Sequence, residues 1–302
     1  MTTHTKENEM FTPGHRACPG CGMAVAVRLI LEAVGRNVII VTPTGCLETF
    51  TSPFAQTPWT VPWVHSLFEN GAAVASGVAA ALRAKKEESG TKVLVMGGDG
   101  ATFDIGLGGI SGMWERGHDI TYICFDNEAY MNTGVQRSSA TTYGAATTTT
   151  PALLGSGGKK EKKKQLTRIA LAHDVNYVAT ATLAYPKDLQ QKSKKAVATK
   201  GSSYLEVLTP CCIGWGFNPE LTVEISRLAV QTALFPLWQK EEGSSLTVKK
   251  LRKVVDIEEY LKQQNRFKHL LEPGWEQELK KVKEIAKENI SQYNLLERRD
   301  EG

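Results

Sequence analysis

Apolar positions along the chain follow two periods, one typical of helices and one typical of buried strands. Helical spacing predicts helices at residues 23–35, 66–86, 106–117, 167–174 and 187–200. Short apolar runs rich in β-branched residues predict buried strands at 37–42, 92–100, 120–125, 177–182 and 203–208. Strands that alternate with helices predict an α/β fold, with a mostly parallel sheet covered by helices on both faces.

Two later segments differ from this alternation. Residues 142–164 are rich in Thr, Gly and Lys, which predicts a loop, and the run KKEKKK at 159–164 indicates a solvated surface or a docking patch for an acidic partner. Beyond residue 240 the pattern weakens, so we divide the chain into a main domain, 1–240, and a C-terminal extension, 241–302. In the extension, the spacing of apolar residues over 275–290 predicts a helix, which packs either on its own domain or on a partner subunit. Its apolar face consists of Trp275, Leu279, Val282 and Ala286.

Composition narrows the class of protein. The chain has 302 residues, 41% of them hydrophobic and 23% charged, as in ordinary globular proteins, and its net charge of +4 gives no indication of a nucleic-acid reader. We expect a cytoplasmic protein outside the membrane, since the first residues are polar and no run approaches the ~18 apolar residues of a membrane span. Six cysteines are too few for a disulfide scaffold, and Cys18 and Cys21 in a CxxC motif point to metal or redox chemistry.

The candidate chemistry lies where two predicted strands end. Gly98, Asp99 and Gly100 follow the strand at 92–100, and the glycines let the backbone approach a ligand closely. Asn127 comes 28 residues after Asp99, directly after the next strand. A carboxylate and an amide oxygen are hard ligands, suited to Mg²⁺ that holds a diphosphate. Neighbouring strands of a parallel sheet would bring the two segments together.

Longer motifs carry a resemblance to a known family. They are HRACPGCG at 15–22, TGCLE at 44–48, PWVHSLFENGAA at 62–73, the segment 97–119 that opens with GGDG, and the segment 126–145 that opens with DNEAYMNTG. Together they closely resemble the β subunits of pyruvate:ferredoxin oxidoreductase and the other 2-oxoacid:ferredoxin oxidoreductases. The similarity runs from about residue 12 to 240, and QNRFKHLL at 264–271 belongs to it as well.

This resemblance implies a thiamine diphosphate-binding fold with Mg²⁺ and a [4Fe–4S] cluster as further cofactors. The implied Mg²⁺ ligands are Asp99, the side chain of Asn127 and the backbone carbonyl of Ala129. Asn132 matches an Asn near the reacting carbon, where it would donate a hydrogen bond to developing negative charge; the alternative is a side chain that stabilises a turn. Thr133 is assigned to cofactor binding beside it.

The resemblance also implies four thiolate ligands for the cluster. They fall on Cys18, Cys21, Cys46 and one of the pair Cys211 and Cys212, of which Cys211 is preferred by alignment on the following GW. A four-thiolate site also suits structural Zn²⁺. The thiamine motif favours iron, because oxidation of a 2-oxoacid requires one-electron acceptors nearby. The sixth cysteine, at position 124, lies inside a predicted strand and is expected in the core.

Several residues in these motifs remain open. His65 and Glu69 either face the cofactor or play ordinary structural parts. Trp59 and Trp63 are expected to pack or to line an interface, and Arg137 is expected to form a salt bridge rather than to meet a substrate carboxylate.

The resulting functional hypothesis is oxidative decarboxylation of a 2-oxoacid to an acyl-CoA and CO₂, with electrons passed to ferredoxin. Pyruvate is the first choice of substrate; 2-oxoglutarate, oxalate and branched-chain or aryl oxoacids are alternatives. Two other hypotheses are a cluster-free thiamine lyase and an electron-transfer subunit without catalysis. The chain offers no second α/β domain for the pyrimidine half of thiamine. The resemblance therefore implies an α-type partner that carries the activating Glu, and a cluster-bearing δ-type subunit or ferredoxin as electron acceptor.

Overall fold

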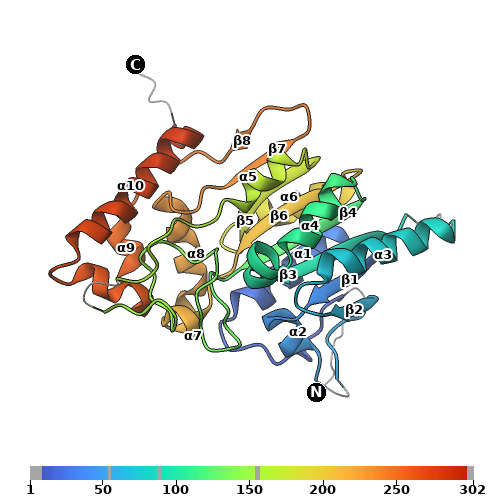
Figure 1. The fold of residues 1–302 in the computed structure, drawn as a ribbon, viewed down its shortest axis with the longest axis horizontal. Helices are drawn as coiled ribbons and strands as arrows, with labels where there is room; N and C mark the ends of the chain where they lie inside the picture. Colours follow the sequence, from blue (N-terminus) through green and yellow to red (C-terminus); the bar gives the residue numbers. More distant parts are fainter. Residues whose placement is uncertain (1–8, 54–55, 87–89, 154–156, 298–302) are drawn as a thin grey trace.

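The computed structural model describes residues 9–53, 56–86, 90–153 and 157–297 (Figure 1). They form an eight-stranded sheet in the order β2-β1-β3-β4-β6-β5-β7-β8. The first six strands in the sequence are parallel, and β7 and β8 pair antiparallel at one edge. The strands are β1 (Val38–Pro43), β2 (Trp63–Ser66), β3 (Lys92–Gly98), β4 (Ile120–Asp126), β5 (Tyr177–Thr182), β6 (Ser203–Leu208), β7 (Trp238–Glu241) and β8 (Thr247–Val248). The predicted α/β class is confirmed.

Helices cover both faces of the sheet, as Figure 1 shows. The α-helices are α1 (Gly22–Val34), α2 (Cys46–Thr51), α3 (Gly71–Ala84), α4 (Leu107–Glu115), α5 (Leu166–Ala172), α6 (Pro186–Ala198), α7 (Cys212–Trp215), α8 (Thr222–Gln231), α9 (Ile257–Leu261) and α10 (Glu276–Tyr293). Short segments of other helix types are η1 (Gly100–Ile105), a π-helix, and the 3₁₀-helices η2 (Pro219–Leu221) and η3 (Asn265–Leu271). Helices α1 and α6 pack on one face, and α3, α4, α5, α8 and the C-terminal helices pack on the other.

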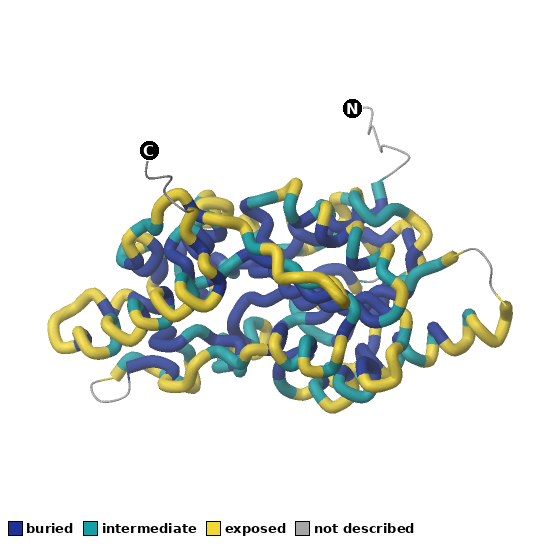
Figure 2. Tube along the Cα trace, turned by 90° about the horizontal axis from the view of Figure 1, so that it is seen from above, coloured by how far each residue is buried: buried dark blue, intermediate teal, exposed yellow. Residues whose placement is uncertain are grey.

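The central strands explain why the two layers of helices are needed. Every residue of β4, β5 and β6 is buried, so their side chains contact helices on both faces. On one face Ile30 and Leu31 of α1 pack with Leu94 of β3; on the other, Val95 of β3 packs with Ala75 of α3. Figure 2 shows the buried residues as a continuous layer through the middle of the molecule. The carboxyl ends of the parallel strands therefore extend from a fully buried part of the sheet.

The structure corrects two local predictions. The helix expected over 66–86 begins only at Gly71: Ser66 ends β2, a strand that the sequence did not indicate, and residues 67–70 form a turn between the two elements. The segment 100–105, which follows β3, is a π-helix that was also missed. A strand of four residues that directly follows Pro62 gives too short a pattern to recognise.

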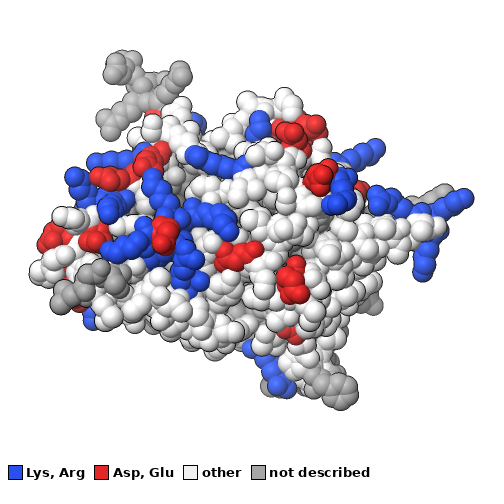
Figure 3. Space-filling view, in the orientation of Figure 1, with Lys and Arg blue, Asp and Glu red and all other residues white. Residues whose placement is uncertain are grey.

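The loop prediction for 142–164 holds for its described residues, 142–153 and 157–164, which contain neither helix nor strand. The interpretation of KKEKKK as a solvated run is wrong for two of its lysines. Lys159 is only 1% exposed, and its ammonium group donates to the carbonyl oxygens of Ser139 and Thr141. Lys163 is half-buried, and its ammonium group lies among buried carboxylates. The other charges remain at the surface, where basic side chains gather among acidic ones on the α10 side of the face in Figure 3.

The C-terminal segment packs on this same chain. Trp275, Val282 and Ala286 are buried, as the predicted apolar face requires, and Val282 and Ala286 belong to the hydrophobic cluster that contains Tyr204 of β6. Leu279 packs against that cluster while partly exposed. No helix among the described residues is long and apolar enough to cross a membrane.

Candidate functional site

The site is built at the carboxyl ends of β3 and β4, which pair in parallel with Gly98 opposite Phe125. Asp99 follows β3 directly, and its side chain is 1% exposed and accepts a hydrogen bond of 2.5 Å from the hydroxyl of Ser138. Burial raises the pKa of Asp99 to about 7. Gly100 next to it leaves no room for a side chain, because a Cβ there would lie 2.4 Å from the ring of Tyr130. The close approach of a ligand to this backbone stays a prediction.

Asn127 and Ala129 bring two more oxygens to Asp99. The side-chain amide of Asn127 reaches to 2.9 Å from Oδ1 of Asp99 and 2.8 Å from the carbonyl oxygen of Ala129. With its nitrogen in that position, the amide donates to both oxygens. A half-turn of the amide instead brings three oxygens together around one point, which is an arrangement suited to a hard cation. The donor set that the sequence predicted for Mg²⁺ therefore fits such an ion.

Glu128, between these two residues, has a left-handed backbone with φ of 65°. Its buried carboxylate accepts hydrogen bonds from Arg266, at 2.7 Å, and from the hydroxyl of Thr142, also at 2.7 Å. The charge of Arg266 helps to hold the pKa of Glu128 below its usual value although burial acts in the opposite direction. Sequence reasoning missed both charged residues. The only signal for Arg266 was its place in the QNRFKHLL motif.

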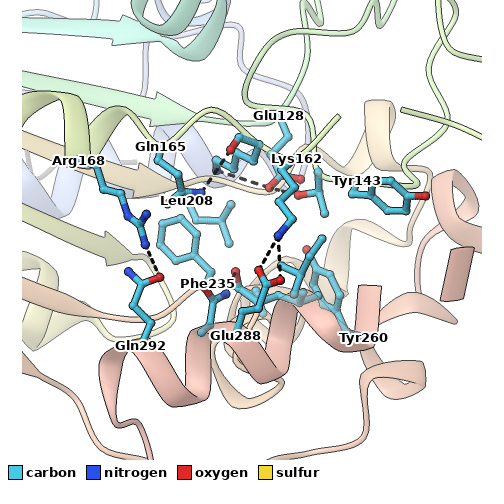
Figure 4. Close-up of a pocket in the computed structure, with 16 residues that line it drawn as sticks. Glu128, Tyr143, Lys162, Gln165, Arg168, Leu208, Phe235, Tyr260, Glu288 and Gln292 are labelled. Atoms are coloured by element: carbon cyan, nitrogen blue, oxygen red, sulfur yellow. Dashed lines mark hydrogen bonds and ion pairs between the residues drawn. The ribbon is translucent and has the colours of Figure 1, made fainter. Parts of the chain in front are cut away.

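A second buried ion pair lies beneath the same loop. The ammonium group of Lys163 contacts Oδ2 of Asp126 and lies 3.3 Å from Oε1 of Glu206. Burial raises the pKa of both carboxyls, and the carboxylates in turn raise the pKa of Lys163 well above its usual value. The adjoining pocket has a volume of about 190 Å³. In Figure 4 the exposed Lys162 reaches from the side of Glu128 across this pocket to Glu288 on α10.

Five of the six cysteines gather around one cavity of about 330 Å³. They are Cys18, Cys21, Cys46, Cys211 and Cys212. Three segments of the chain contribute them. Cys18 and Cys21 lie in the turn before α1, where the amide of Cys21 donates to the carbonyl of Cys18. Cys46 is the first residue of α2, and Cys211 and Cys212 lie at the start of α7. The sixth, Cys124, is buried within β4 and belongs to the core, as predicted.

Burial raises the pKa of four of these thiols, those of Cys21, Cys46, Cys211 and Cys212. It raises the pKa of Cys46 to about 12, and the thiols of Cys211, Cys21 and Cys18 add to that shift. It raises the pKa of Cys211 to about 11. A bound metal would remove the protons from such thiols.

Cys211 and Cys212 differ in their surroundings. The sulfur of Cys211 accepts a hydrogen bond of 3.3 Å from the amide of Gly214 and lies among the groups that act on Cys46. The thiol of Cys212 instead donates to the carbonyl oxygen of Pro19, at 3.2 Å, and its side chain is buried. These contacts favour Cys211 as the ligand.

Within the described ranges, no three His, Cys, Asp or Glu side chains lie close enough together to hold a single metal ion. The oxygens around Asp99 include only one carboxylate, so they form a different kind of site. Four thiols spaced around a cavity suit a group larger than one ion, as cysteine-ligated iron–sulfur clusters are.

The cysteine cavity joins a second cavity, of about 140 Å³, at the ends of β3 and β4. The second cavity is lined by Gly98, Asp99, Gly100, Ala129 and Thr133, the residues predicted to bind cofactor. Both cavities share Met23, Cys46, Asn127 and Asn132. The structure thus brings the predicted cofactor residues and the predicted thiol ligands to two adjoining cavities.

Three other residues that the sequence analysis singled out, all in the described part of the chain, line neither of the two cavities. His65 and Glu69 are exposed, although Nε2 of His65 is 3.0 Å from the hydroxyl of Thr44, which does line the second cavity. Arg137 forms the expected salt bridge, at 3.5 Å from Glu161.

The two tryptophans pack as predicted. The rings of Trp59 and Trp63 are stacked with their centroids 6.1 Å apart, and the ring of His65 stacks on Trp63 in turn. These three rings form one ladder along the β2 edge of the sheet.

Residues 43–207 match the family described as thiamine pyrophosphate enzyme, C-terminal TPP binding domain. This span includes Asp99, Asn127 and Ala129. The fold and the matched segment together define the chain as a thiamine diphosphate-dependent enzyme.

Whole-chain similarity is more specific. Pyruvate synthase subunit PorB of Methanosarcina barkeri is 49% identical over 292 residues, which cover 96% of this chain and 99% of that protein. Ketoisovalerate oxidoreductase subunit VorB of Pyrococcus abyssi is 43% identical and covers 87% of this chain and 86% of its own. The chain belongs to the family of 2-oxoacid:ferredoxin oxidoreductase β subunits, which confirms the resemblance drawn from its motifs.

A solved structure supports the fold. The 2-oxoglutarate:ferredoxin oxidoreductase from Magnetococcus marinus, with 2-oxoglutarate, coenzyme A and succinyl-CoA bound, aligns with a TM-score of 0.57 and 23% identity. The alignment covers 74% of this chain and 79% of that one.

Proposed function

We propose that this subunit carries the diphosphate half of a thiamine diphosphate site and a [4Fe–4S] cluster for the oxidative decarboxylation of pyruvate. The substrate is proposed from the names of the relatives, of which the more similar one reported above is a pyruvate synthase subunit. The products would be acetyl-CoA, CO₂ and reduced ferredoxin, and the reaction could run in either direction.

One observation carries this proposal: the cavity at Asp99 and the cavity of the thiols adjoin each other, and Cys46, Asn127 and Asn132 line both. Thiamine diphosphate, when bound, supplies the carbon that attacks a 2-oxoacid and stores the electrons left after CO₂ departs. A cluster in the adjoining cavity would accept those electrons one at a time. The shared lining supports both groups together better than either one alone.

Each residue then has a defined task. Asp99, the side chain of Asn127 and the carbonyl of Ala129 would hold Mg²⁺, with Gly98 and Gly100 letting the diphosphate lie against the backbone. Thr133 lines the cavity and would contact the cofactor. Asn132, which reaches both cavities, would donate a hydrogen bond to negative charge that develops on the substrate.

Cys18, Cys21, Cys46 and Cys211 would hold the iron of the cluster. Structural Zn²⁺ is the competing occupant of four thiolates, and iron and zinc analysis of the purified complex distinguishes the two. A protein with no iron would support a cluster-free thiamine lyase instead. Iron without bound thiamine diphosphate would support an electron-transfer subunit.

The site needs partners. The described residues form a single sheet, whereas thiamine also requires a pyrimidine-binding domain with an activating Glu. We therefore propose an α-type subunit for that domain, a δ-type subunit or ferredoxin as electron acceptor, coenzyme A as co-substrate, and a cytoplasmic location. Residues 1–240 would form the cofactor-binding domain and 241–302 an extension.

The test is an assay of the copurified complex for viologen reduction with a panel of substrates. Pyruvate should give the highest kcat/KM among pyruvate, 2-oxoglutarate, branched-chain and aryl oxoacids, and oxalate. Faster turnover with another member of the panel would replace pyruvate, and no reduction with any of them would overturn the proposed reaction.

A further inference from the structure

The backbone of Glu128 is held in a conformation that side chains other than glycine rarely adopt. Its φ of 65° lies in the left-handed region, which is unfavourable for an L-residue with a side chain. This residue stands between Asn127 and Ala129, whose oxygens meet Asp99. A change of backbone at this one position would turn both oxygens away, so the surrounding contacts have to stabilise it.

Arg266 supplies the strongest of those contacts. It is 6% exposed, and its guanidinium donates to Oε2 of Glu128 at 2.7 Å. The same group is itself fixed, since Nε donates to Oε1 of Gln264 at 2.9 Å and another nitrogen donates to the hydroxyl of Tyr260 at 3.3 Å. A buried arginine with this many partners has one available geometry.

Arg266 also contacts Trp215, which in turn contacts the loop. Its guanidinium carbon lies 3.5 Å from the centre of the Trp215 ring, which is a close cation–π contact. The indole nitrogen of Trp215 donates to the carbonyl oxygen of Asn127 at 2.7 Å. The backbone amide of Ala146, in the loop that carries Thr142, donates to the carbonyl of Arg266. The side chain of Arg266 therefore helps to hold the loop at two neighbouring residues: at Glu128 through the carboxylate, and at Asn127 through Trp215.

We propose that Arg266 is a positioning residue for the Mg²⁺–diphosphate site, through which the C-terminal extension becomes part of the cofactor site. This inference depends on the proposed function, because it takes Asn127 and Ala129 as ligands of Mg²⁺. Arg266 contacts neither the metal nor the diphosphate. It acts by holding Glu128 and Trp215, as outer groups orient the ligands of other metal sites.

The variants for the test are Arg266→Met, which keeps the length of the side chain without its charge, and Arg266→Lys, which keeps the charge without the planar fork. Arg227→Met is the matched control, since Arg227 is an exposed arginine paired with Glu224 on α8. Each complex is stripped of thiamine diphosphate and Mg²⁺ with a chelator. Titration with both is then followed by calorimetry.

We expect Arg266→Met to weaken cofactor binding by about 10- to 100-fold, the usual effect of losing a group that orients metal ligands. Arg266→Lys should lie between it and the wild type, and Arg227→Met should match the wild type. At saturating cofactor, kcat should recover, because the catalytic groups are unchanged. Wild-type affinity in a folded Arg266→Met complex would overturn the inference while leaving the proposed function intact; a wild-type complex that binds no thiamine diphosphate would overturn both.

Amide hydrogen exchange in the cofactor-free complex gives a readout independent of binding. Arg266→Met should speed exchange in a peptide that spans residues 126–130 and leave a peptide from β5 unchanged. Equal acceleration in both peptides would mean that Arg266 only stabilises the fold. If Arg266→Met fails to assemble, Arg266→Lys and Glu128→Gln are compared in the same way, and unchanged exchange at 126–130 in both would overturn the proposal.

Discussion

Cys46 and Asn132 meet where the two cavities join, although 86 residues separate them in the sequence: Sγ of Cys46 lies 3.5 Å from Oδ1 of Asn132. The amide nitrogen of Asn132 donates to the hydroxyl of Thr49 at 3.2 Å, so both ends of the side chain are held by α2. When Cys46 binds a metal and loses its proton, its sulfur no longer donates to Oδ1, so the bond to Thr49 is the one that would hold the amide near the junction.

The first prediction concerns Asn132. Asn132→Ala should lower kcat for oxoacid-dependent viologen reduction by roughly 100-fold, the typical effect of removing one preorganised donor. Thiamine diphosphate and iron content should not change. Asn176→Ala is a suitable control, because Asn176 lies just before β5, at the opposite end of the parallel strands. Turnover near that of the wild type would mean that Asn132 only stabilises its turn.

The second prediction concerns the metal ligands. Asp99→Ala removes the one charged oxygen ligand, so retention of thiamine diphosphate should fall by more than the roughly 10–100-fold that outer groups contribute. The visible absorbance of the cluster should survive, because the thiols belong to other loops. Cofactor content is measured in the purified complex, with Asp119→Ala, an exposed partner of Lys92, as the control. A normal cofactor content in Asp99→Ala would refute the assigned ligand.

The third prediction separates the cysteines. Serine at Cys18, Cys21, Cys46 or Cys211 should lose or convert the cluster, as seen by iron content and electron paramagnetic resonance. Serine at Cys212 or Cys124 should keep four irons, because their thiols face Pro19 and the core of the sheet. Loss of the cluster in Cys212→Ser with retention in Cys211→Ser would reverse the choice between the two neighbours.

The fourth prediction compares two adjacent lysines. Lys163→Met leaves Asp126 and Glu206 buried without their cation, which should lower the free energy of unfolding by about 3–5 kcal/mol. Lys162→Met removes only an exposed pair with Glu288 and should change it by less than about 1 kcal/mol. Denaturant unfolding of the purified chain measures both. Equal effects would show that the buried carboxylates do not depend on Lys163.

The fifth prediction is that the chain alone is inactive. After reconstitution with thiamine diphosphate, Mg²⁺ and iron–sulfur cluster, it should reduce viologen at only a small fraction of the rate of the complex, because an open half-site leaves the reactive carbon exposed to water. Addition of the purified α-type partner should restore the rate. Full activity without that partner would mean that the activating Glu lies in this chain.

The part of the site that the sequence predicted lies at the carboxyl ends of adjacent strands. Asp99 and Asn127 each follow an apolar run, and strands β3 and β4 do lie side by side, so their meeting was derivable from spacing alone. The residues that the sequence analysis missed support the site, but they are far along the chain from the residues they contact. Lys163 belongs to a run that is typical of a solvated surface, and its partners come from β4 and β6. Arg266 approaches Glu128 across 138 positions, which no local pattern can indicate.

Both edges of the sheet end in short strands. At one edge β2 has four residues, and at the other β8 has two. An extended chain that added to either edge would find few main-chain groups to bond, which disfavours the edge-to-edge growth that leads to aggregates. Contacts with partner subunits are therefore expected to use side chains and loops instead of lengthening the sheet.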